Sequence, residues 1–338
     1  MRTARVALLL TLAVLLPSCT SDPPTSAAPE KATTATSPGG TPEPPSTSTT
    51  DSAASEPQAT ESSEAPVTFD ADAALATVRR LAGEIGPREG TSEAYAEAAA
   101  LVADRFRALG YDVRSEPFRV PRGVSWGVPV PAGRSANVVA VPPGFRPDRP
   151  HVLLGAHLDT VPQAPGAEDN ASGVAVLLEL ARLAAAEETA LPTVLVAFGA
   201  EEPRGSGDDR HHFGSQHHVR QMAPAQRRAL VAMVSLDRVG TGSRVPVRTG
   251  GVTPPRVQRE LLAAARDLGI ATTRSTDNRA SDHWSFEKAG VVAARLGSTP
   301  YAAYHSARDR PGVVRRRALE RVGRVAWEWL RTGSGGSR

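Results

Sequence analysis

Cysteine and lysine are almost absent from this chain. Cys19 is the only cysteine among 338 residues, which excludes an intramolecular disulfide and a metal site built on thiolates. Lys31 and Lys288 are the only lysines, so the basic charge comes almost entirely from arginine. The basic residues are scattered and are not interleaved with aromatic residues, and we therefore expect no nucleic-acid partner.

Two hydrolase signatures are missing or out of context. The only Gly-x-Ser-x-Gly pattern, residues 123–127, is followed closely by Pro129 and Pro131, where no helix is expected, so the strand–turn–helix elbow of a serine hydrolase is absent. It contains no His-Glu-x-x-His segment, which argues against a thermolysin-type protease. A hydrolytic activity would therefore depend on a different set of residues.

The N-terminal segment is typical of an exported protein. Arg2 and Arg5 precede an apolar run, residues 6–16, that is too short to cross a bilayer as a helix, so we interpret residues 1–18 as a signal peptide. Residues 16–19 resemble the lipobox of bacterial lipoproteins, in which Cys19 is lipidated, although Pro17 is unusual there. We expect a lipid anchor on the outer face of the bacterial cell membrane; the alternative is a plain secretory signal and a secreted protein.

Composition divides the rest of the chain. Residues 20–66 are almost all Ser, Thr, Pro, Ala and Glu, and such a segment cannot bury enough apolar surface to offset its ordering entropy. We therefore predict a disordered tether over residues 19–66. Residues 67–333 have a globular composition and a length that suits one large domain, and residues 334–338 are expected to form a disordered tail.

Apolar periodicity gives the expected elements of that domain. Helical spacing predicts helices at residues 69–85, 92–109, 172–187, 255–268 and 313–329, with Gly110 as a C-cap. Continuous apolar runs predict strands at residues 112–120, 136–141, 152–156, 194–198, 230–236, 245–249 and 291–296. The alternation predicts an α/β fold with a mostly parallel central sheet that is flanked by helices on both faces.

Residues that can bind a metal follow several of these strands. His157, the pair Glu201 and Glu202, and Asp237 each come at or just after a strand end. In open α/β sheets the carboxyl ends of the strands form the ligand crevice, so these side chains should converge. Asp169 precedes the helix at 172–187, and His305 lies in the loop before the last helix. Each residue alone is more often a cap or a loop contact, but their joint occurrence predicts a metal site.

The residue types suit two zinc ions per chain. We expect Asp169 to bridge them, with His157 and Asp237 completing one site and Glu202 and His305 completing the other. A water shared by the ions would be the nucleophile. The spare carboxylate, Glu201, would act as the general base, Asp159 would orient the His157 imidazole, and Tyr304 would donate to a developing oxyanion.

On these residues the chain resembles the co-catalytic di-zinc exopeptidases. That family contains secreted bacterial leucine-type aminopeptidases, and its relatives include glutamate carboxypeptidase-like proteins and glutaminyl cyclases. The resemblance runs from about residue 70 to 332 and is carried by residues 85–88, 108–112, 157–159, 168–173, 201–202, 236–237, 281–286, 289–290 and 304–306. It implies a zinc exopeptidase-like three-layer sandwich, the zinc ligands given above, and a cis peptide bond after Asp169.

One segment departs from the family pattern. Members usually pass from the Glu pair to a Gly-Ser step within a few residues, whereas residues 203–213 intervene here, and we expect this loop to border the cleft. Four nearby histidines are interpreted as surface or loop residues and not as ligands: His211, His212, His217 and His218. The role of His283 is left open, and a place in the cleft without contact to metal is one option. Asp309 is expected to be a structural anchor for its loop or a cap, and not a ligand.

The leading hypothesis is therefore an aminopeptidase that cleaves peptides with a free N-terminus. A single-zinc glutaminyl cyclase would use a similar ligand set, and metal stoichiometry would separate the two. A catalytically inactive, tethered binding module is the alternative from another class, and the presence of Glu201 with the full ligand set argues against it.

Overall fold

The computed structural model describes residues 67–333. The predicted signal peptide (1–18), tether (19–66) and tail (334–338) lie outside the described residues. Within the described part of the chain, no helix combines the length and the apolar character that crossing a membrane requires.

A central eight-stranded sheet organises these residues, in the order β1-β4-β6-β5-β7-β10-β8-β9. The strands are β1 (Asp112–Val120), β4 (Gly133–Val141), β5 (His151–His157), β6 (Thr193–Phe198), β7 (Leu230–Leu236), β8 (Val245–Arg248), β9 (Thr272–Ser275) and β10 (Ala293–Leu296). The middle strands β6, β5, β7 and β10 are parallel to one another. Every residue of β5 and β6 is buried, as expected for parallel strands covered on both faces.

The two sides of the sheet differ from this parallel centre. β1 runs antiparallel to β4, β4 runs antiparallel to β6, and β8 runs antiparallel to β10. β1 and β4 are joined by a short segment that contains only the hairpin β2 (Gly123–Ser125) and β3 (Val128–Val130), and so short a connection suits antiparallel strands. The predicted α/β class is confirmed, and the sheet is mixed.

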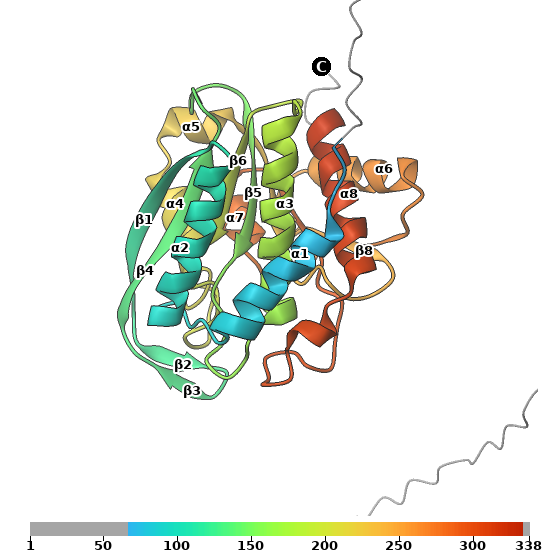
Figure 1. Cartoon of the computed structure of the whole chain (residues 1–338). Helices are drawn as coiled ribbons and strands as arrows, with labels where there is room; N and C mark the ends of the chain where they lie inside the picture. Colours follow the sequence, from blue (N-terminus) through green and yellow to red (C-terminus); the bar gives the residue numbers. More distant parts are fainter. Residues whose placement is uncertain (1–66, 334–338) are drawn as a thin grey trace, which may run out of the picture. The chain divides into compact units, whose positions relative to one another are not determined.

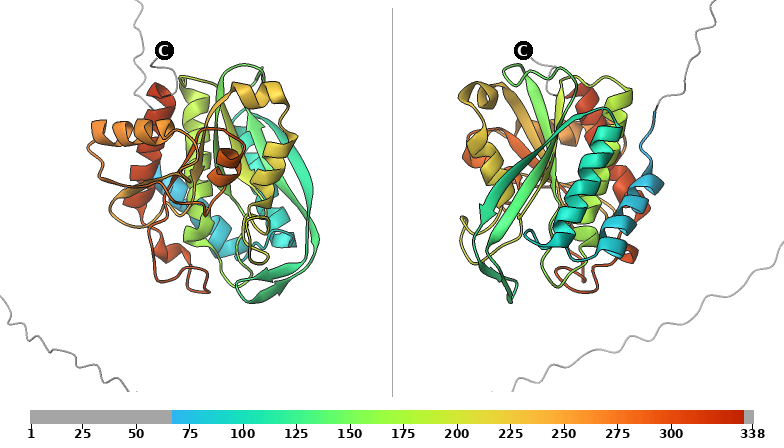
Figure 2. Two further views of the ribbon diagram at one scale, coloured as in Figure 1. Left: turned by 180° about the vertical axis from the view of Figure 1, so that it is seen from behind. Right: turned by 60° about the vertical axis from the view of Figure 1, so that its left-hand side comes forward.

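Helices cover both faces of the sheet (Figures 1 and 2). On one face lie α1 (Ala71–Val78) with its π-helical continuation (Arg79–Ile85), α2 (Glu93–Ala108), α3 (Ser172–Ala186) and α8 (Arg316–Thr332), and α6 (Arg256–Asp267) packs against α8. The other face carries α4 (Phe213–Gln221), α5 (Pro224–Ala229) and α7 (His283–Lys288). Each face has its own cluster of buried apolar side chains, which gives the three-layer sandwich.

Local signals explain where the first helices begin and end. The Asp70 carboxylate accepts hydrogen bonds from the backbone N–H groups of Asp72 and Ala73, and the Ser92 hydroxyl accepts one from Tyr95. These are N-cap interactions, which satisfy donors that the first helical turn leaves free. Gly110, with a φ of 86°, follows the end of α2 as the sequence predicted.

A buried arginine joins the N-terminal helices to the loop after β5. The Arg88 guanidinium is fully buried and donates to five carbonyl oxygens, those of Leu81, Gly86, Leu158, Pro165 and Gly166. Burial lowers its pKa to about 10, so the guanidinium is still charged at neutral pH. The 158–166 segment, which leads to Asp169, is thereby held against the start of the domain.

Candidate metal centre

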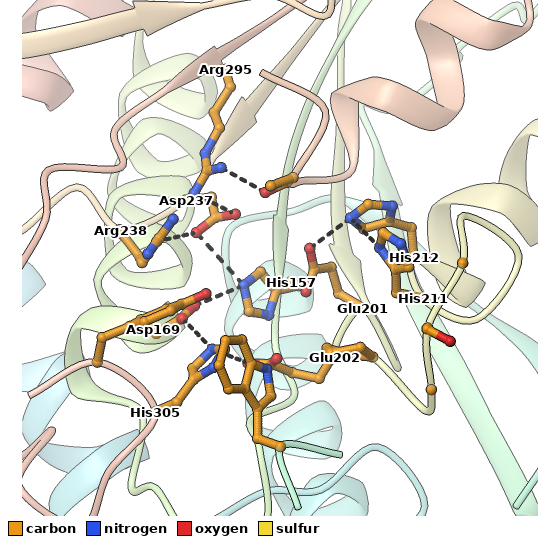
Figure 3. Close-up of a pocket in the computed structure, with 17 residues that line it drawn as sticks. His157, Asp169, Glu201, Glu202, His211, His212, Asp237, Arg238, Arg295 and His305 are labelled. Atoms are coloured by element: carbon orange, nitrogen blue, oxygen red, sulfur yellow. Dashed lines mark hydrogen bonds and ion pairs between the residues drawn. The ribbon is translucent and has the colours of Figure 1, made fainter. Parts of the chain in front are cut away.

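The sheet brings four of the predicted residues to one edge. His157 ends β5, Glu201 and Glu202 follow β6, and Asp237 follows β7. In the register of the sheet His157 lies beside Phe198 of β6, and Gly155 beside Ser235 of β7, so these strands end at nearly the same level. Because the three strands are adjacent and parallel, their carboxyl ends open into a common crevice (Figure 3).

Asp169 lies between two groups of side chains. Its Oδ1 is 3.2 Å from His157 Nε2, and its Oδ2 is 3.0 Å from His305 Nε2. On one side His157 Nε2 is 3.7 Å from Asp237 Oδ1; on the other His305 Nε2 is 3.3 Å from Glu202 Oε1. The structure therefore brings all five predicted ligands together, in the two pairs that the sequence predicted.

The loop around Asp169 is held by backbone contacts. The Asp309 carboxylate accepts from the N–H groups of Glu168 and Asp169, and the Tyr301 hydroxyl donates to it at 2.9 Å. Asp309 is thus the structural anchor that the sequence predicted. The peptide bond between Asp169 and Asn170 is cis, also as predicted.

Asp159 organises the residues on the neighbouring strand end. Its carboxylate accepts from the N–H groups of Glu201 at 2.9 Å and Glu202 at 3.1 Å. The nearest partner of His157 Nδ1 is the Asp159 carbonyl oxygen at 3.2 Å, whereas the carboxylate lies at 3.7 Å. Asp159 is therefore placed to orient His157 mainly through its backbone, and its carboxylate fixes the two glutamates.

The electrostatics of the site favour a bound cation. Burial alone would lower the pKa of His305, but Glu202 and Asp169 raise it to about 10. Burial raises the pKa of Glu201 and of Glu202 to about 8, because several carboxylates share one water-poor space. Asp237 Oδ1 is buried without a hydrogen-bond partner among the described residues. Nitrogen and carboxylate oxygen atoms converge here, and this donor set fits zinc.

Two arginines that no sequence pattern predicted stand beside Asp237. Arg295 is fully buried, and its Nη2 lies 3.0 Å from Asp237 Oδ2. The Arg238 guanidinium lies 4.4 Å from the centre of the Tyr304 ring. Arg295 and Asp237 are 58 positions apart in the chain and meet only because β10 pairs with β7, so no local pattern could have revealed the contact.

Aromatic residues form the rim of the site. Tyr304 is 38% exposed, and its ring stacks on His305 with 3.7 Å between centroids. Trp126, at the tip of the β2–β3 hairpin, is 53% exposed and packs edge-on against His305. Both line a cavity of about 320 Å³ that also contains the five candidate ligands, Glu201 and part of the 203–213 loop. The loop borders the cleft, as the sequence predicted.

The histidines near this loop are only partly where we expected them. His218 is buried on α4, where its Nδ1 lies 2.7 Å from Glu116 Oε2, so the expectation of a surface or loop position is wrong. His217 is half-buried on α4 and stacks on Phe118. His212 does lie in the loop, but it is buried, and its Nε2 is 3.1 Å from Glu201 Oε1.

His283 is not in the cleft. It is fully buried at the start of α7, its Nε2 lies 2.9 Å from the Asn278 carbonyl oxygen, and it does not line the cavity. Of the positions that the sequence left open for His283, the cleft is therefore excluded, because its side chain is buried at the start of α7.

The family model for peptidase family M28 matches residues 137–330, which is more than half of the chain. The chain belongs to this family. The match includes all five candidate ligands together with Glu201, and it agrees with the family suspected from the sequence.

Individual relatives agree with this assignment. Aminopeptidase YwaD of Bacillus subtilis is 30% identical over 167 residues, a region that covers 48% of this chain and 35% of YwaD. The chain thus spans about a third of the length of that curated relative. A zinc aminopeptidase from Bacillus subtilis has a similar fold, with a TM-score of 0.68 and 20% identity, over 77% of this chain and 94% of its own. A glutaminyl cyclase from Bacteroides thetaiotaomicron also has a TM-score of 0.68, with 21% identity, over 80% of this chain and its full length.

Proposed function

We propose that this protein is a zinc-dependent aminopeptidase that removes N-terminal residues from peptides. The observation that carries the proposal is the position of Asp169, whose two oxygens each face a different imidazole at 3.0–3.2 Å. A carboxylate that serves two such groups suits two zinc ions per chain, one with His157 and Asp237 and the other with Glu202 and His305. Family membership and the similarity to aminopeptidase YwaD support the same activity.

Glu201 and Tyr304 would carry out the steps that the zinc ions do not. When bound, the zinc ions would polarise the scissile carbonyl and lower the pKa of a water molecule. Glu201 is buried beside the ligands but is not needed to complete either group, so it can take a proton from the attacking water and pass it to the leaving amine. Tyr304 borders the cavity and would donate its hydroxyl to the developing oxyanion.

The decisive test combines metal content with peptide hydrolysis. The purified chain is analysed by plasma mass spectrometry and assayed with a panel of aminoacyl-nitroanilides, with and without a chelator. We expect two zinc ions per chain and chelator-sensitive release of nitroaniline. One zinc without release, together with cyclisation of an N-terminal glutamine, would favour a glutaminyl cyclase. A chain without metal would instead favour a binding module.

A further inference from the structure

The end of the 203–213 loop lies beside Glu201, close to where the loop begins. It leaves the site after Glu202, and at its end the N–H of His212 donates to the Glu201 carbonyl oxygen at 2.8 Å. The N–H of Phe213 donates to the Ala200 carbonyl oxygen at 3.0 Å. These two backbone bonds pair the end of the loop with the segment that carries Glu201, and they place the His212 side chain beside the Glu201 side chain.

The two side chains are in direct contact. His212 Nε2 lies 3.1 Å from Glu201 Oε1, and the side chains line the same cavity (Figure 3). His212 is 1% exposed, so its ring is shielded from bulk water. Its other ring nitrogen, Nδ1, is buried without a hydrogen-bond partner among the described residues. His211 Nδ1 is 3.2 Å from the same Nε2, but a carboxylate is the stronger acceptor for an N–H group.

Further contacts hold the loop at its base and at its tip. At the base the buried Arg204 guanidinium donates to the carbonyl oxygens of Pro121 and Pro131 and pairs with Glu89. At the tip the Asp208 carboxylate accepts from Trp284 Nε1 at 2.8 Å and from Lys288 Nζ at 2.5 Å. These contacts restrain the loop on both sides of its turn and favour the observed position of His212.

A third metal site is the competing interpretation of this cluster. Potential ligand atoms of Asp208, His211 and His212 lie within 4.8 Å of one another. However, the Asp208 carboxylate is already bonded to Trp284 and to the Lys288 ammonium group, whose charge would repel a cation. The contacts therefore favour a role for His212 toward Glu201.

We propose that His212 is a positioning residue for Glu201. Its Nε2–H group donates to Glu201 Oε1 and fixes the carboxylate, so that the second oxygen is presented to the attacking water. This inference rests on the proposed function, in which Glu201 is the general base. It also explains why the 203–213 loop is longer than the family pattern, because this loop places His212 beside the proposed base, Glu201.

The backbone conformation at His212 makes it possible to choose variants that separate the effect of the backbone from the effect of the side-chain contact. Its φ of 58° lies in the left-handed region, which asparagine tolerates better than most residues. Glutamine is strained there, but its longer amide can place an N–H group near the position of Nε2. If the backbone conformation alone matters, His212→Asn should outperform His212→Gln; if the contact with Glu201 matters, the order should reverse. His217→Gln, half-buried on α4, is the matched control.

The first readout is steady-state kinetics with an aminoacyl-nitroanilide, alongside zinc content and thermal unfolding. We expect His212→Ala and His212→Asn to lower kcat by about 10–100-fold, with little change in KM or zinc content, because such supporting partners typically contribute that much. His212→Gln should recover part of the loss. Unchanged kcat in His212→Ala, or an asparagine variant as active as the glutamine variant, would overturn the proposal.

A second readout does not depend on turnover. In ¹⁵N NMR spectra of the chain, the His212 imidazole should show a protonated Nε2, and its resonances should shift in Glu201→Ala but not in the control Glu93→Ala. A His212 ring that does not respond to Glu201→Ala would refute the contact. The two possible failures are distinguishable, because an inactive wild-type chain contradicts the proposed function, whereas an active wild-type chain with an equally active His212→Ala variant contradicts only the role of His212.

Discussion

Asp169 is the residue on which the geometry of the metal centre depends. Its two oxygens face His157 and His305, and its backbone N–H is bound by Asp309. The carboxylate is therefore held from behind while both oxygens point toward the other candidate ligands. Each of those ligands serves one side of the site, and Asp169 alone serves both.

Replacement of Asp169 should consequently affect both metal ions. We expect Asp169→Ala to purify with almost no zinc and no hydrolytic activity, because each remaining half would keep only one imidazole and one carboxylate. Zinc is measured per chain by plasma mass spectrometry after dialysis. Asp237→Ala is the comparison, and it should lose one ion of the two. Retention of both ions in Asp169→Ala would contradict the bridging role.

Glu201 should be separable from metal binding. We expect Glu201→Gln to keep its zinc and its thermal stability but to lose about 10²–10⁴-fold in kcat, because glutamine cannot accept the proton of the attacking water. The exposed Glu93→Gln variant is the control. Near-normal turnover by Glu201→Gln would show that another group is the base.

Residues at strand ends were predictable, whereas partners from distant segments were not. His157 and Asp237 stand directly at the ends of apolar runs, so their convergence follows from the parallel sheet. Arg295 reaches Asp237 through strand pairing across 58 positions, and His212 reaches Glu201, 11 positions before it, only because the loop between them closes. The sequence around Arg295 and His212 has no local periodicity that would indicate these contacts.

At the scale of elements, length decided what could be predicted. The long helices α2, α3 and α8 show clear periodicity and lie within a few residues of their expected bounds. The six-residue helices α5 and α7 are too short to show a full amphipathic pattern. The β2–β3 hairpin turns through Trp126 and Gly127, both with positive φ, and a tryptophan at that position is not a usual turn signal.

The contact between β1 and α4 predicts an acid-sensitive step in stability. Burial alone would raise the pKa of Glu116, but the hydrogen bond and charge of His218, together with Arg114 and Asn137, lower it from 4.5 to about 2. A carboxylate with a lowered pKa stabilises the fold above its unfolded pKa, and the contribution is lost as the pH falls from about 4.5 toward 2.

We therefore expect wild type and Glu116→Gln to differ most in the free energy of unfolding near neutral pH, by up to about 3 kcal/mol, and to converge as the pH falls to about 2 and below. Urea denaturation at a series of pH values measures this difference. Glu93→Gln, at an exposed position, should follow the wild-type pH dependence. A constant gap between wild type and Glu116→Gln across the range would exclude the linkage.

At the scale of the whole molecule, the alternation of buried runs and helices was sufficient to predict the layers. β5 and β6 are buried along their entire length, and the cores on the two sides of the sheet are both apolar. The antiparallel sides were not predictable in the same way, because strand direction depends on how the connections cross the sheet and not on the composition of the strand.

Attachment to a membrane is a proposal that rests on the sequence of residues 16–19. We expect the full chain, produced in a bacterial host, to sediment with the membrane fraction and Cys19→Ser to appear in the soluble exported fraction, because the variant lacks the thiol that carries the lipid. Mass spectrometry of the N-terminal peptide checks the modification directly. Ser18→Ala, which keeps the thiol, is the control. Membrane retention of Cys19→Ser would contradict the anchor.

The contacts of Arg88 show that the folded domain extends beyond the region that matches the family. The family match begins at residue 137, yet the guanidinium of Arg88 donates to Leu158, Pro165 and Gly166, on the loop that leads to Asp169. Excision at the matched border would leave these carbonyls without their donor, at a cost of roughly 1–3 kcal/mol for each one that stays buried. The smallest unit that folds on its own should therefore include the helices before Arg88, even though they lie outside the region that identifies the family.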